Sequence, residues 1–356
     1  MIDTTTKFTH IVEALIDYDQ PFPPRMLRTF SDLTPNHLRE LKATWPTVKH
    51  ERKVALLEDL ETVAESDTLV NFDEFAKMAL RDEDPAVRVL AIRLLWECEE
   101  ARLVPIFTEM MHEDLVEDVR AAAASALGKF VLLGELETIP EELRISNVQN
   151  LLDVAMGEDL PMVRRRALES LGFSSHPKVP ELIEKALKTQ ETQWLTSALY
   201  AMGRSADERW ENLVQDYLSS EDGEVQFEAI RAAGELEIED AREELFELLD
   251  RTNDDADLRY AIIWSLSQIG GNSVKRKFEE LVEKCTDDEE AEWLEKALDN
   301  LELGGDLNEM ELLEFGEDKA NAEDSDETDE DEDEEDDEDD EDTMEMNDLD
   351  EEDYEN

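Results

Sequence analysis

Two His-Glu dipeptides are the residues best suited to bind a metal. His50 precedes Glu51, and His112 precedes Glu113. Imidazole nitrogens and carboxylate oxygens are common ligands of iron and zinc, so two pairs brought together would supply four ligand atoms. The two pairs occupy different places in the repeat described below, and we therefore expect solvated surface residues. The sequence predicts no metal and no cofactor.

Other signals of catalysis are absent from the sequence. It contains no phosphate-binding glycine loop and none of the motifs G-x-S-x-G, H-E-x-x-H or C-x-x-C. Cys98 and Cys285 stand alone, which is typical of reduced, buried thiols in a cytosolic protein. One basic triplet, Arg164-Arg165-Arg166, could bind an acidic segment of a partner or of this chain's own tail. We expect a protein that is not an enzyme.

An internal sequence repeat of helical spacing determines where the His-Glu pairs and the basic triplet lie. An apolar anchor is followed by a small or apolar residue four positions later, an apolar residue eight later and often glycine nine later. This spacing places the residues on one buried stripe of a helix, and the glycine is expected to end the helix in a left-handed conformation. A second apolar helix follows in each unit. The seven anchors are Val87, Val119, Val163, Trp194, Val225, Leu258 and Trp293, and Glu51 with Ala55 begins a degenerate eighth unit.

Two of these units carry a family resemblance. Asp84-Pro85-Ala86-Val87-Arg88 and Leu160-Pro161-Met162-Val163-Arg164, each with alanine four residues after the valine, resemble HEAT repeats. The short period and the Ala-Leu-Gly ending are similar to the subtype of phycobilisome-lyase-like proteins. The resemblance implies an all-α fold, a right-handed α-solenoid of about seven or eight helix pairs. Arginine after the anchor is expected to pair with acids of the adjoining repeat, at Arg88, Arg120, Arg164 and Arg259.

The resemblance also suggests two possible enzymatic functions. The deoxyhypusine hydroxylase family resembles this architecture and binds two irons through four His-Glu pairs, whereas this chain has two pairs, both in its N-terminal half. A chromophore lyase or an accessory to one is the alternative function, and no short motif supports it. An absorption spectrum of the purified protein would reveal a bound metal or bilin and would separate these readings from a binding protein.

The net charge of the chain limits which classes of molecule it is expected to bind. The chain of 356 residues has a formal net charge of −63, and residues 317–356 alone contain 27 acids and one base. Nucleic acids and anionic membranes are bound through Lys and Arg, so we expect neither as a partner. The sequence shows no signal peptide and no long apolar run, which predicts a cytoplasmic protein. We also expect a monomer. The acidic excess is also typical of adaptation to high salt.

Composition divides the chain into three parts. Residues 1–48 lack the repeat and are expected to form an irregular helical cap, with Thr34 capping a helix that begins at Pro35. Residues 49–316 form the repeat array, with an insertion at 134–142 that either adds a turn of helix or forms a binding loop. Residues 317–356 are expected to be a disordered acidic tail.

The anchor helices predict where a protein partner would bind. If they line the concave groove, the residues two, three and six positions after each anchor face it. Aromatic and arginine side chains dominate the energetics of interfaces. The candidate partner-binding residues are Arg93, Arg165, Arg166, Tyr200, Phe227, Arg231, Tyr260 and Trp264.

The predicted function is a non-catalytic scaffold. Its groove would bind a segment of a partner protein, and its acidic body and tail favour a basic partner. The tail has a second possible role, because it could screen the arginine-bearing groove until a partner displaces it. Packing of Tyr260 and Trp264 into the core is the alternative to their exposure in the groove.

Overall fold

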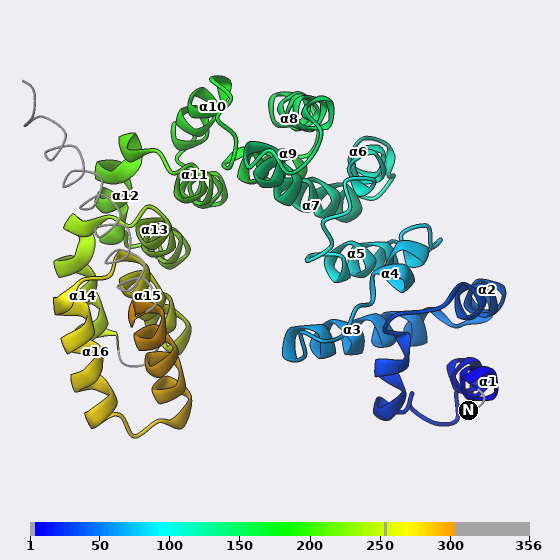
Figure 1. Ribbon diagram of the computed structural model, residues 1–356. Helices are drawn as coiled ribbons and strands as arrows, with labels where there is room; N and C mark the ends of the chain where they lie inside the picture. Colours follow the sequence, from blue (N-terminus) through cyan, green and yellow to red (C-terminus); the bar gives the residue numbers. More distant parts are fainter. Residues whose placement is uncertain (1–3, 253–254, 303–356) are drawn as a thin grey trace, which may run out of the picture. The chain divides into compact units, whose positions relative to one another are not determined.

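The computed structural model describes residues 4–252 and 255–302, and it describes side chains from Phe8 onward. Helices alternate between two layers (Figure 1). The first-helix layer contains the anchor helices, and the second-helix layer contains the helix that follows each of them. The described residues contain no strand, and they belong to one compact unit. The predicted all-α solenoid is confirmed.

Seven helices form the first-helix layer, in which each helix packs against the next. They are α3 (His50–Ser66), α5 (Pro85–Leu94), α7 (Glu117–Glu135), α9 (Pro161–Leu171), α11 (Thr192–Arg204), α13 (Gly223–Glu235) and α15 (Ala256–Ile269). A further helix over residues 288–302 follows them. The second-helix layer contains α4 (Asp73–Ala79), α6 (Leu103–Glu113), α8 (Glu141–Met156), α10 (Lys178–Leu187), α12 (Glu211–Leu218), α14 (Arg242–Arg251) and α16 (Asn272–Lys284).

Four short elements precede the array: α1 (Thr4–Ile16), η1 (Pro24–Phe30), α2 (Pro35–Thr44) and η2 (Trp45–Thr47). Thr34 caps α2 as predicted, because its hydroxyl accepts a hydrogen bond from the amide of His37. Phe30 and Trp45 pack edge-on against Phe75 of α4, with ring centroids 4.9 and 5.3 Å apart. The N-terminal elements therefore cover the first helix pair. Two further single turns, η3 (Glu208–Trp210) and η4 (Glu239–Ala241), lead into α12 and α14.

The first unit has a different anchor from the one predicted. Glu51 and Ala55 are exposed, and the buried stripe of α3 contains Lys53, Leu57 and Leu60. Lys53 replaces an apolar anchor because its ammonium lies 2.6 Å from Asp82 Oδ2, so the buried charge is neutralised. The register was wrong because a polar side chain occupies a core position.

The glycines after the anchors do not end helices in a left-handed conformation, as the sequence analysis expected. Gly128, Gly203 and Gly234 lie inside helices and are buried. A Cβ atom on Gly234 would lie 2.7 Å from Ser265 Cα. These glycines are small so that successive first-layer helices can approach closely. Gly270, delayed by one turn, is the repeat glycine with positive φ, at 68°.

Arginines after the anchors connect neighbouring units, as predicted for three of the four. Arg88 and Arg120 each hold a carboxylate through Nε and Nη2, on Asp114 and Asp159 respectively, at 2.8–2.9 Å. Arg259 pairs with Glu290. Arg164 differs, because it donates to the carbonyl oxygen of Ala155 and lies over the ring of Trp194.

The insertion at 134–142 falls at the end of α7 and the start of α8, so it lengthens the second helix pair. The predicted acidic tail at 317–356, and the end of the array beyond residue 302, lie outside the described residues.

Candidate protein-binding face

Two of the pockets in the described part of the chain are lined mainly by helices of the first-helix layer, one toward each end of the array. The N-terminal pocket, about 600 Å³, lies between α3, α5, α7 and α9. Its lining includes the residues two, three and six positions after two successive anchors: Val89, Leu90, Arg93, Ala121, Ala122 and Ser125. The predicted positions of both helices therefore line one pocket.

Trp96 forms a wall of the N-terminal pocket with its side chain largely free. The residue is 69% exposed and follows the last turn of α5. It stands nine residues after Val87, where other units have glycine. Lys129 donates to the backbone carbonyl of Trp96 at 3.1 Å, which fixes the turn that carries the indole. Sequence reasoning missed Trp96, although a tryptophan in place of the repeat glycine was the available signal.

Three cations also line the N-terminal pocket. Arg93 forms an ion pair with Glu61, with 2.8 Å between Nε and Oε1. Arg166 binds Glu169 of its own helix, and Lys129 lies 3.6 Å from Glu99. Each cation already has a carboxylate partner, and two further acids, Glu58 and Asp118, line the otherwise mainly apolar pocket.

The C-terminal pocket, about 610 Å³, brings four of the predicted residues together. Phe227 and Arg231 come from α13, and Tyr260 and Trp264 come from α15. Trp293, on the helix over residues 288–302, completes the aromatic lining. Phe227 and Tyr260 are half-buried and pack against the core, whereas Trp264 is half-buried and Trp293 is exposed.

Trp293 is a pocket residue rather than the buried anchor that the repeat predicted. It is 37% exposed, whereas its neighbour Leu294 is completely buried. The Trp293 ring stacks on Tyr260, with centroids 5.4 Å apart and planes at 16°. An apolar pattern alone could not separate these two adjacent residues, because either could face the core.

Arg165 and Tyr200 lie between the two pockets. Arg165 is 9% exposed, so it does not stand in an open groove as predicted. Its Nη1 makes long contacts to Gln193 O and Ser197 Oγ, at 3.3 and 3.4 Å. Burial lowers the pKa of Arg165, and its Nε has no hydrogen-bond partner in the described part of the chain. Arginine in this position joins α9 to α11.

A network of buried charges continues from α9 to α13. Ser197 donates to Glu169 at 2.7 Å. Arg204 lies 3.0 Å from Glu235 and over the ring of Tyr200, whose pKa burial raises. Glu228 makes no ion pair among the described residues, and burial raises its pKa to about 7, against the attraction of Arg231.

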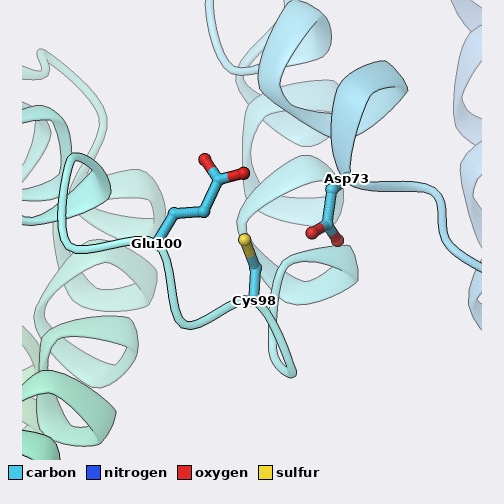
Figure 2. Close-up of side chains that lie close together, drawn as sticks. All are labelled: Asp73, Cys98 and Glu100. Carbon is cyan, nitrogen blue, oxygen red and sulfur yellow. The ribbon is translucent and has the colours of Figure 1, made fainter. Parts of the chain in front are cut away.

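The two His-Glu pairs contact different neighbours. His50 Nδ1 contacts the carboxylate of Asp84, and His112 Nε2 lies 3.0 Å from Asn150 Oδ1. Among the residues described, Asp73, Cys98 and Glu100 are the group whose potential ligand atoms lie within 4.8 Å of one another (Figure 2). This group was not predicted.

The neutral thiol of Cys98 lies beside two carboxylates, of which that of Glu100 is paired with cations. Burial raises the pKa of Cys98 to about 11, and Asp73 adds to the shift. Glu100 is hydrogen-bonded to Arg102 and lies 2.7 Å from Lys77 Nζ. A thiolate ligand would have to form against burial and a neighbouring carboxylate, so the group is a structural contact between α4 and the loop before α6.

No helix in the described ranges is long and apolar enough to cross a membrane.

Comparison with known proteins identifies the repeat. Residues 72–143 and 210–299 match the family model of HEAT repeats. No curated protein sequence matches the chain. Many solved structures are similar to the chain, and at the identities of the three given next this similarity extends to the fold alone. YibA of Escherichia coli is 15% identical, and the match covers 85% of this chain and 97% of that chain with a TM-score of 0.38. Human deoxyhypusine hydroxylase in complex with glycerol is 18% identical, and the match covers 75% of this chain and 96% of that chain with a TM-score of 0.32. A chain of the structure in which Kap95p binds RanGDP is 15% identical, and the match covers 84% of this chain and 41% of that chain with a TM-score of 0.37.

These comparisons do not distinguish the phycobilisome-lyase-like subtype, which stays a prediction. Because the family model matches two stretches of the sequence, the chain contains HEAT repeats in residues 72–143 and 210–299.

Proposed function

We propose that this protein is a non-catalytic scaffold that binds a basic segment of another protein along the open face of its first-helix layer. The observation that carries the proposal is Trp96, a largely exposed indole on the wall of an apolar pocket of about 600 Å³. Tryptophan is over-represented among residues that dominate binding energy, and exposed apolar patches mark interaction sites.

The shape of the N-terminal pocket suits the apolar side chains of a partner segment. Val89, Leu90 and Ala122 form its floor, with Phe130 beside them. Burial of apolar surface against this floor would supply most of the binding energy, at roughly 25 cal/mol per Å² before the cost of ordering the segment. Since Arg93, Lys129 and Arg166 are already paired with acids of this chain, they give no reason to prefer an acidic partner.

The net charge of −63 supports the choice of a basic partner. Long-range attraction would raise the association rate, and salt would reduce it. Residues 317–356 contribute 27 of the acids. Removing them should slow association if the tail attracts the partner, and should strengthen binding if the tail screens the face instead.

A comparison of two surface variants tests the proposal. The wild-type chain, Trp96→Ala and Leu115→Ala would be used to capture proteins from the cells that make it. Leu115 is a matched control, because it is 96% exposed and does not line either pocket. Partners captured by wild type and Leu115→Ala should be lost with Trp96→Ala.

Calorimetry with a purified candidate partner then decides the matter. We expect saturable one-to-one binding that Trp96→Ala weakens by at least tenfold. Equal affinity of the Trp96→Ala and Leu115→Ala variants for every candidate would contradict the proposal.

A further inference from the structure

We propose that the C-terminal pocket binds the side chain of an arginine or lysine in the partner segment. This inference rests on the proposed function, because the segment belongs to the same protein partner. It adds the chemistry that the pocket recognises and the residues that do so.

The pocket wall is aromatic on several sides. The stacked pair of Tyr260 and Trp293 joins α15 to the helix over residues 288–302, and Phe227 and Trp264 line the pocket from α13 and α15. The faces of aromatic rings are electron-rich and attract cations, most strongly for tryptophan. A volume of about 610 Å³ is ample for one long side chain, whose methylene groups would pack against the rings.

The chain's own cations show that these rings accept a positive charge. The guanidinium carbon of Arg231 lies 5.6 Å from the ring centroid of Trp264, and Lys296 Nζ lies 5.8 Å from that of Trp293. Both distances are within the range at which a cation is attracted to an aromatic face. Arg231 also forms an ion pair with Glu235 of its own helix, at 3.5 Å.

Acidic side chains without ion-pair partners indicate that the ligand carries a positive charge. Asp255 and Asp257 line the pocket, and neither forms an ion pair with a described residue. Asp255 caps α15 by accepting the amide hydrogen of Leu258, whereas the exposed Asp257 makes no such contact in the described ranges. Burial raises the pKa of the Tyr260 hydroxyl, and Glu289 on the last helix and Asp287 just before that helix add to the shift.

Charge complementarity therefore favours a cation over an anion. Among the residues that line the pocket, Asp255 and Asp257 outnumber the single cation, Arg231. A partner carboxylate would meet these acids, whereas a guanidinium or ammonium could lie on the rings with its charge directed toward Asp257. Arg231 competes with such a ligand for Trp264 and repels it.

The test uses a synthetic peptide and the full chain. The probe is a fluorescent nine-residue peptide with three arginines separated by Gly-Ser, and its control has citrulline in place of each arginine. Citrulline has nearly the shape of arginine and no charge. Fluorescence anisotropy at low ionic strength should show at least tenfold weaker binding of the citrulline peptide.

Two substitutions of equal charge separate the pocket from the general acidity of the chain. Asp257→Asn should weaken binding of the arginine peptide about threefold, the size expected for one partly exposed charge contact. Asp240→Asn removes the same charge from η4, at an exposed residue that does not line the pocket, and should change binding far less. Equal effects of the two substitutions would overturn the inference.

Arg231→Gln gives the sharpest result, because its expected effect is a gain. Removing the competing guanidinium should strengthen binding of the arginine peptide severalfold and leave the citrulline peptide unaffected. Unchanged or weaker binding of the arginine peptide would overturn the inference. Thermal unfolding of each variant checks that the fold is intact.

A further arm distinguishes this inference from the proposed function. Trp96→Ala lies in the other pocket and should leave the affinity for the arginine peptide unchanged. A natural partner that depends on Trp96 but not on Asp257 would overturn the cation site alone. If no partner depended on Trp96 for binding, the proposed function would be contradicted instead.

Discussion

Arg120 holds Asp159 by two parallel hydrogen bonds, from Nε at 2.9 Å and from Nη2 at 2.8 Å. The pair joins α7 to the turn that begins α9, and Nη1 of the same guanidinium donates to Asp114 O. Both side chains are largely buried. One arginine therefore connects α7 to the turns that precede α7 and α9.

Arg120→Ala should lower the free energy of unfolding by about 2 kcal/mol, because it leaves a partly buried carboxylate and a carbonyl without their donor. Urea denaturation followed by circular dichroism measures the change. Arg251→Ala is the control, since the Arg251–Glu247 pair is largely exposed and should be worth less than about 0.5 kcal/mol. A similar loss in both variants would contradict the prediction.

The same pair gives a pH dependence with a definite sign. The hydrogen bond from Arg120 is the main cause that lowers the pKa of Asp159 in the folded chain. Stability from the pair is therefore complete above the ordinary pKa of an aspartate and is lost as the pH falls through the lower folded value. The difference in stability between wild type and Arg120→Ala should shrink below about pH 4.

Close helix packing at the repeat glycines makes a second prediction. Gly234→Ala would place a methyl group 2.7 Å from the backbone of Ser265. Although alanine favours a helix, the forced separation of α13 and α15 should cost roughly 1–2 kcal/mol net, seen as a lower melting temperature. Gly223→Ala, in the first turn of α13, has no atom within 4 Å of the new methyl group. That control should keep or raise the melting temperature.

Glu228 makes the array less stable as the pH rises. Burial raises its pKa from 4.5 to about 7, and the charged groups that act on it are Arg231, Glu235, Glu169 and Arg204. The folded state therefore binds a proton that the unfolded state releases between these two values, so the contribution of Glu228 to stability falls across this window.

Glu228→Gln should remove that loss. We expect the variant to be more stable than wild type by on the order of 2 kcal/mol at pH 8, with the difference closing toward pH 4. Thermal unfolding at a series of pH values measures it. A constant difference at all pH values would show that the carboxyl does not titrate in this window.

The two cysteines should react with thiol reagents at very different rates. Cys98 is buried and its pKa is raised to about 11, so the reactive thiolate is scarce at pH 8. Cys285 is half-buried and follows the last residue of α16. Ellman's reagent should label one thiol promptly and the second only in denaturant. A Cys285→Ser variant that still reacts promptly would contradict this assignment.

Helix pairing was predictable because each unit repeats one stripe of apolar residues at helical spacing. Val119, Ala123 and Leu127 are all completely buried, as their positions required. The predicted anchor of the first unit was wrong because Lys53 occupies a core position. Its neutralising partner, Asp82, lies 29 residues away along the chain. A periodic pattern detects apolar residues and cannot recognise a buried ion pair.

The candidate face was predictable in part. The register placed Phe227, Tyr260 and Trp264 at one pocket, although pattern alone could not tell exposure from burial. Arg165 shows the limit most clearly. Three successive arginines on α9 point in different directions, so Arg166 lines a pocket while Arg165 is buried against α11. Only the neighbouring helix determines which of the three remains accessible.

The arginine that lacks a carboxylate partner has a consequence for how the array unfolds. Arg88, Arg120 and Arg259 couple consecutive units through ion pairs, whereas Arg164 lies over Trp194. In a chain of nearest-neighbour interfaces, the most weakly coupled interface is where cooperative unfolding divides. Across the α9–α11 junction, hydrogen bonds of Arg165 and Ser197 take the place of that ion pair, and we expect the array to divide into two unfolding blocks there. Each block contains one of the two pockets, so either pocket could be lost while the other remains formed.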